Sequence, residues 1–164
     1  MPLQMARYDE SRTAQLGHRA VVLGGSMAGL CAARVLSDSF DEVVIIERDS
    51  LPSDPEIRSG APQTSQPHAM LEAGRVTLGD FFPGFDADIQ AAGGLKLDMI
   101  DDVVWYNRGG AVAGTDADLP ALYASRSLFE HVVRERIRDD DTISVRDGCH
   151  FVEYQHDADS GQVT

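Results

Sequence analysis

The sequence predicts an α/β domain built around a strand, a tight turn, a helix and a second strand. The continuous apolar run at 20–23 is typical of a buried parallel strand. A glycine-rich turn follows it, and residues 26–38 then place apolar side chains at helical spacing. A second apolar run at 43–46 ends at Glu47. These elements form a βαβ unit, for which a right-handed crossover is expected.

The rest of the chain is expected to add loops, helices and a smaller β-rich region. Residues 48–67 are rich in proline and lack apolar periodicity, which predicts a long functional loop. Helices are expected at 68–82, 86–92 and 126–138. Short strands are expected at 103–106, 111–112, 122–124, 143–145 and 150–154. The last of these would continue through a turn at 157–161 into a β-meander. Ser127 and Glu130 have the spacing of a capping box at the start of the third helix.

The composition narrows the class of protein. The chain has 164 residues and a formal net charge of −13, so its surface repels a nucleic-acid backbone. No apolar run approaches the roughly 20 residues of a membrane span. Residues 1–18 show no signal peptide, and the two cysteines form neither a disulfide framework nor a metal-ligand pattern. We therefore expect a cytoplasmic protein that binds no nucleic acid.

The turn at 24–29 matches a dinucleotide-binding fingerprint in its proper context. Gly24 allows a sharp turn, Ser26 is a small residue in the second slot, and Gly29 lets the helix pack closely. Glu47 stands 18 residues after Gly29, where a carboxylate accepts hydrogen bonds from a ribose and repels a 2′-phosphate. The residues predicted to bind the ADP half are Gly24, Gly25, Ser26, Met27, Ala28, Gly29 and Glu47. The alternative is a βαβ unit whose glycine turn serves packing alone.

Four segments together resemble a known family. The segments R-A-V-V-L-G-G-S-M-A-G-L and V-V-I-I-E-R-D resemble the opening of FAD-dependent monooxygenases of the para-hydroxybenzoate hydroxylase type. The segment R-S-G-A-P-Q-T-S-Q-P-H-A-M-L from Arg58 resembles a bacterial subgroup that includes polyether epoxidases and is related to squalene epoxidase. The segment A-S-R-S-L-F-E from Ala124 is similar to a helix start in that subgroup. Ser65 and Gln66 depart from its loop pattern.

The resemblance implies a Rossmann-like FAD-binding domain with a three-layer core that leads into a β-rich substrate region. Residues 19–164 would form its N-terminal part, after a disordered tail at 1–18. Later family motifs that complete the FAD site do not occur here, which implies a missing segment or a complementary C-terminal polypeptide. The cofactor contacts implied beyond the turn are Arg48, Arg58, Gln63 and Arg126. Arg126 also stands at a helix N-terminus, where a cation requires a nearby anion.

The function that the resemblance implies is monooxygenation of a small hydrophobic aromatic or polyene substrate. NADPH or NADH would reduce FAD, and a flavin C4a-hydroperoxide formed with O2 would insert one oxygen atom to give an epoxide or a hydroxylated product. Other readings remain open: an isoprenoid reductase, a flavin halogenase or a non-catalytic fragment. No catalytic residue is assigned. His68 is expected at a helix start, and Trp105 with Tyr106 either line the substrate or pack a sheet.

Overall fold

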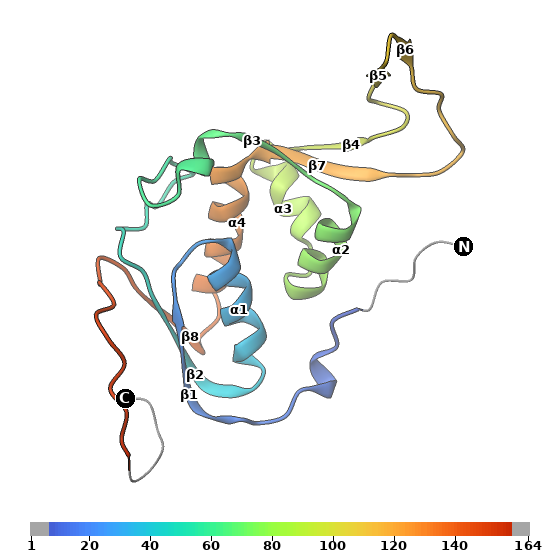
Figure 1. Cartoon of the computed structure of the whole chain (residues 1–164). Helices are drawn as coiled ribbons and strands as arrows, with labels where there is room; N and C mark the ends of the chain where they lie inside the picture. The colour runs from blue at the N-terminus through green and yellow to red at the C-terminus, as the bar shows by residue number, and fades with distance from the viewer. Residues whose placement is uncertain (1–6, 159–164) are drawn as a thin grey trace.

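The computed structural model describes residues 7–158. It contains a parallel three-stranded sheet, against which helices pack (Figure 1). Its strand order is β1-β2-β8, with β1 at Gly17–Leu23, β2 at Phe40–Ile46 and β8 at Ile143–Arg146. Helix α1, at Met27–Ser37, connects β1 to β2. The predicted strand–turn–helix–strand unit is therefore confirmed, and the mixed α/β class with it.

Helices α1 and α4 pack on one face of this sheet (Figure 1). Helix α4 spans Arg126–Arg138 and contacts both α1 and β8. Apolar side chains of the sheet and of both helices join one buried cluster, which includes Val22, Ile45, Ile143, Leu30, Ala33, Val133 and Ile137. On β1 the intervening residues Val21 and Leu23 are 54% and 40% exposed. One face of the sheet is thus buried in the core, whereas on the other face Val21 and Leu23 of β1 are exposed and Val44 of β2 is buried.

A second, antiparallel sheet lies at one end of the helices (Figure 1). Its order is β3-β7-β4, with β3 at Pro67–Met70, β7 at Pro120–Ser125 and β4 at Leu95–Asp98. Helices α2 at Glu72–Phe81 and α3 at Phe85–Ala91 separate β3 from β4 in the sequence. A small hairpin, β5 at Tyr106–Asn107 and β6 at Gly110–Ala111, projects from the ends of β4 and β7 (Figure 1).

The expected helix at 68–82 is wrong in its first turn. Residues 67–70 form strand β3, in which His68 pairs with Ala124 and Pro67 with Ser125 of β7. His68 therefore lies in a strand and not at a helix start. The backbone of this segment finds its hydrogen-bond partners more than fifty positions away, so the pairing overrides a local helical pattern. The remaining expected helices correspond to α3 and α4.

Several other expectations need correction. Residues 103–105 lie outside any strand, and β4 was not expected at all. Ser125, and not Ser127, caps α4, because its Oγ accepts from the Leu128 amide at 3.1 Å. The expected strand at 143–145 is confirmed as β8, which runs parallel to β2. Residues 150–154 form no strand in the described part of the chain. Most of the turn at 157–161 lies outside the described residues.

The structure describes residues 7–18, which precede the expected domain start at residue 19. A 3-10 turn, η1, spans Glu10–Arg12, and β1 starts at Gly17. The Tyr8 ring lies edge-on to Phe81 at 5.1 Å, and its hydroxyl donates to Asp38. These contacts place Tyr8 against α2 and the end of α1. Within residues 7–158, no helix is both long and apolar enough to cross a bilayer.

Candidate functional site

The turn between β1 and α1 has a geometry that requires glycine at two positions. Gly24 has φ +102°, in the left-handed region, and its amide donates to the Ile46 carbonyl at 2.8 Å. A Cβ atom on Gly29 would lie 1.8 Å from the Gly24 carbonyl oxygen. The first and third glycines therefore have the physical tasks that the sequence predicted for them. The turn brings the N-terminus of α1 against the end of β1.

Ser26 occupies the N-cap position of α1 without capping it. Its backbone is extended, and its carbonyl accepts the first helical hydrogen bond from Leu30 at 2.9 Å. The Ser26 side chain does not bond to the amides of the first turn. Its hydroxyl instead donates to the Glu130 carboxylate at 2.7 Å. The N-cap side chain thus leaves these amides, which lie at the positive end of the helix dipole, uncapped.

Glu47 faces the same turn from the carboxyl end of β2. Its carboxylate is largely buried, accepting from the Gly25 amide at 2.6 Å through Oε2 and from the Asp49 amide at 2.9 Å through Oε1. A Cβ on Gly25 would lie 3.1 Å from the Glu47 Cβ, so this contact also favours glycine. The structure thus brings Glu47 to the turn, as the spacing predicted. A carboxylate has further lone pairs that can accept from a sugar diol.

A cavity of about 440 Å³ opens between these parts. Its wall includes Gly24 and Ser26 of the turn, Glu47 at the end of β2, and residues 149–151. The Cys149 amide donates to the Glu47 carbonyl at 2.9 Å, which anchors this C-terminal segment beside the turn. Sequence reasoning missed residues 149–151, because nothing in their pattern indicates that they return to the turn.

Arg58 lies buried beside the turn and is surrounded by carboxylates. Its Nε and Nη2 donate to Glu130 Oε1 at 2.9 and 2.5 Å. Its Nη1 lies 3.3 Å from an Asp49 oxygen and 3.8 Å from Glu47 Oε2. Only 4% of the Arg58 side chain is exposed. The arginine for which the resemblance implied a cofactor contact is therefore engaged by protein carboxylates, and it does not line the cavity.

Arg126, at the start of α4, carries an unsatisfied donor. Its backbone amide donates to the Gln66 carbonyl at 3.0 Å, but its buried Nε has no hydrogen-bond partner among residues 7–158. The guanidinium lies close enough to α1 to act on Cys31: burial raises the pKa of this thiol to about 11, and the Arg126 charge opposes that rise. A buried cationic donor at the N-terminus of α4 that lacks a partner among the described residues suits an anionic ligand.

The two other predicted contacts occupy different positions. Arg48 lines the cavity with a side chain that is 62% exposed. Gln63 lies in the 3-10 turn η2, at Pro62–Ser65, where it is exposed and does not line the cavity. The structure therefore groups Arg48 with the glycine turn and leaves Gln63 outside.

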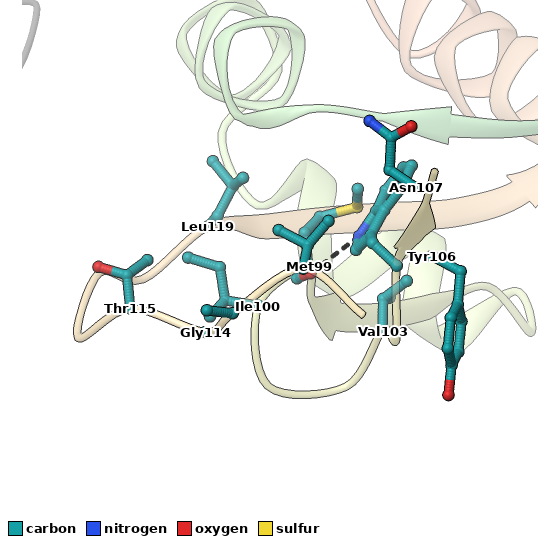
Figure 2. Close-up of a pocket in the computed structure, with 11 residues that line it drawn as sticks. Met99, Ile100, Val103, Tyr106, Asn107, Gly114, Thr115 and Leu119 are labelled. Atoms are coloured by element: carbon teal, nitrogen blue, oxygen red, sulfur yellow. Dashed lines mark hydrogen bonds between the residues drawn. The ribbon is translucent and has the colours of Figure 1, made fainter. Parts of the chain in front are cut away.

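A second cavity, of about 620 Å³, lies in the projecting arm at residues 99–119. Figure 2 shows that its lining comes from the segment after β4 and the segment before β7. Trp105 donates from its indole nitrogen to the Met99 carbonyl at 3.3 Å, yet 53% of its surface is exposed. Tyr106 also lines this cavity. Both aromatic residues thus line an apolar cavity, which has no lining residue in common with the cavity at the glycine turn.

The comparisons with known proteins identify what the fold resembles. No family model matches the chain. Protein Rv3254 of Mycobacterium tuberculosis is 39% identical over 122 residues, which cover 72% of this chain and 26% of that protein. The chain therefore spans about a quarter of the length of this curated relative.

Two solved structures share the arrangement of elements. PqsL, a probable FAD-dependent monooxygenase from Pseudomonas aeruginosa, matches with a TM-score of 0.64 at 15% identity, over 90% of this chain and 40% of that chain. The 2-methyl-3-hydroxypyridine-5-carboxylic acid oxygenase matches with a TM-score of 0.57 at 19% identity, over 91% and 37%. The described residues therefore have the fold of a part of such oxygenase chains.

Proposed function

We propose that this chain is the FAD-binding part of a flavin-dependent monooxygenase. The observation that carries the proposal is the junction of Gly24, Gly29 and Glu47. Gly24 has a left-handed conformation, and α1 approaches the turn so closely at Gly29 that a Cβ does not fit. This arrangement places the amides of α1 beside the buried carboxylate of Glu47. This combination matches the needs of an adenosine diphosphate: amides for the phosphates and a carboxylate for the ribose.

The residues present fit FAD in charge and in donor type. The first-turn amides of α1 would hold the diphosphate, and Glu47 would accept from the ribose hydroxyls. Arg126 would direct its Nε, which has no partner in the described part of the chain, at an acceptor of the cofactor. Arg48, on the cavity wall, would lie beside the adenosine. We assign Arg58 an indirect role, because three carboxylates already surround its guanidinium. Gln63 lies in the long loop outside the cavity, and we propose that it contacts the flavin from there.

When bound, FAD would supply the redox chemistry that joins a nicotinamide reductant, dioxygen and an organic substrate. The protein would position the cofactor and exclude water. We propose NADPH or NADH as reductant and a small hydrophobic aromatic or polyene substrate. Epoxidation, in the manner of the subgroup that the segment from Arg58 resembles, and hydroxylation are both compatible with this site. Further polypeptide beyond the described residues would complete the FAD and substrate contacts.

The test is a comparison of two glutamates, one within β2 and one directly after its end. In the complete protein, Glu47→Gln removes the charge that a ribose diol requires, so the FAD dissociation constant should rise about tenfold or more. Glu42→Gln is the matched control, since Glu42 bonds Arg19 at 2.7 Å, away from the turn. Its FAD affinity should equal that of the wild type.

Fluorescence titration with FAD measures both variants, and oxygen uptake with NADPH or NADH tests the reaction class. Absence of FAD binding by the wild type would refute the proposal. Binding without oxygen-dependent NAD(P)H oxidation would refute the monooxygenase assignment and favour another flavoenzyme class.

A further inference from the structure

We propose that Glu130, a buried carboxylate on α4, is a positioning residue that keeps the phosphate-binding amides of α1 open. It does so by holding the Ser26 hydroxyl away from these amides. The inference rests on the proposed function, because it concerns the same dinucleotide turn. It adds a residue that lies outside the glycine fingerprint and does not line the cavity.

Glu130 connects two distant segments inside the core. It is 1% exposed, and its two oxygens have separate partners. Oε1 accepts from Arg58 Nε and Nη2, and Oε2 accepts from the Ser26 hydroxyl at 2.7 Å. These bonds join α4 to residues 72 and 104 positions earlier in the chain. Arg58 therefore fixes the orientation of the carboxylate, and the carboxylate fixes the hydroxyl.

The position of this hydroxyl matters because serine is among the strongest N-cap residues. An N-cap serine normally accepts with its side-chain oxygen from the second or third amide of the helix. In α1 these are the amides of Ala28 and Gly29, which the diphosphate would need. A Ser26 hydroxyl that capped the helix would compete with the cofactor for them. The bond to Glu130 is accompanied by the absence of a side-chain cap on α1.

The ion pair between Arg58 and Glu130 stabilises this arrangement. A carboxylate buried without a cation would be costly, and a charge-assisted pair with two donors is a strong one. Arg134, also on α4, lies 3.7 Å from the same Oε1 atom and adds a second positive charge. The two cations therefore hold the carboxylate in place, with Oε2 directed at Ser26. The segment around Arg58 thereby acts on the phosphate site through Glu130.

A rescue experiment separates this role from simple packing. In the complete protein, Glu130→Ala releases the Ser26 hydroxyl, which can then cap α1. The FAD dissociation constant should rise about fivefold, because the cofactor would have to displace an N-cap hydrogen bond that contributes ~1 kcal/mol. Ser26→Gly alone removes the hydroxyl and serves as the reference for the double variant, since glycine is also a good N-cap. The double variant should bind FAD within about twofold of Ser26→Gly.

A double variant that binds FAD as weakly as Glu130→Ala would overturn the proposal, because the loss would then come from packing. If Glu130→Ala fails to fold, Glu130→Asp replaces it, with the same Ser26→Gly rescue. Aspartate keeps the charge for Arg58 but is one methylene too short to serve both partners. Failure of the wild type to bind FAD would refute the proposed function itself. Wild-type binding without rescue would refute only the role of Glu130.

Discussion

The backbone of Gly29 in α1 lies so close to Gly24 that a side chain cannot fit between them. A Cβ on Gly29 would meet the Gly24 carbonyl oxygen at 1.8 Å and its carbonyl carbon at 2.9 Å. Both contacts involve backbone atoms, which cannot rotate away as a flexible side chain would. The close approach of helix and turn therefore depends on this one residue.

Gly29→Ala is expected to destabilise the protein by about 1–3 kcal/mol, because the turn and the helix must separate. Denaturant unfolding measures this change. Gly79→Ala on α2 is the matched control: a Cβ there would meet nothing within 4 Å. It should raise stability by roughly 0.5–1 kcal/mol, as expected of alanine in a helix. Equal stability of Gly29→Ala and the wild type would contradict the packing described.

Arg126→Met is expected to separate cofactor affinity from stability. The buried Nε of Arg126 has no partner within the described chain, so its removal should leave the free energy of unfolding unchanged or raise it. The FAD dissociation constant should rise roughly tenfold if this donor bonds the cofactor. FAD titration and denaturant unfolding of the complete protein measure the two quantities.

Arg136→Met on the same helix provides the control for Arg126. Arg136 donates to Asp88 and to the Pro83 carbonyl, so its loss should lower stability and leave FAD affinity unchanged. If Arg126→Met instead lowered stability with no change in FAD binding, Arg126 would be a structural residue.

The two cysteines should differ in reactivity at pH 8. Burial raises the pKa of Cys31 to about 11, so the reactive thiolate of that residue is scarce. Cys149 is exposed and lines the cavity beside Glu47. A maleimide should therefore label Cys149 and spare Cys31. FAD should slow the labelling of Cys149, as followed by peptide mass spectrometry, with the unfolded protein as the reference for full labelling. Labelling of Cys149 at an unchanged rate in saturating FAD would place the cofactor elsewhere.

Asp86 is expected to make part of the stability dependent on pH. Burial raises the pKa of its carboxyl, but hydrogen bonds from Lys96 and Arg75 outweigh burial and lower it overall. A lowered pKa contributes stability above the unfolded-state value near 4, and this contribution is lost as pH falls through the folded-state value. Asp86→Asn should cost ~1 kcal/mol at pH 7 and progressively less below pH 4.

Urea unfolding between pH 3 and 7 measures the effect of Asp86→Asn. Asp116→Asn, in an exposed segment, should show no such trend. A difference between Asp86→Asn and the wild type that stayed constant across this range would rule out a contribution from ionisation.

The local βαβ unit could be predicted because its signals are short in range. The apolar runs at 20–23 and 43–46 and the glycines between them determine strand, turn and helix from neighbouring residues alone. Helix α4 followed in the same way from the periodicity of 126–138. The strand at Pro67–Met70 could not be predicted in this way, because two helices and three strands separate it from its partner β7 in the sequence.

The residues of the candidate site also fall into two groups: those that local sequence predicts and those that only tertiary contacts bring together. The sequence by itself determined the glycine turn and the acidic residue that ends β2, since each depends on backbone conformation within one βαβ unit. Only the tertiary structure decided that Arg58 belongs to Glu130, that Glu130 reaches Ser26, and that Cys149 returns to the wall beside Glu47. Ion pairs and cavity walls depend on distances in space, and residues up to 104 positions apart become neighbours only after the chain has folded.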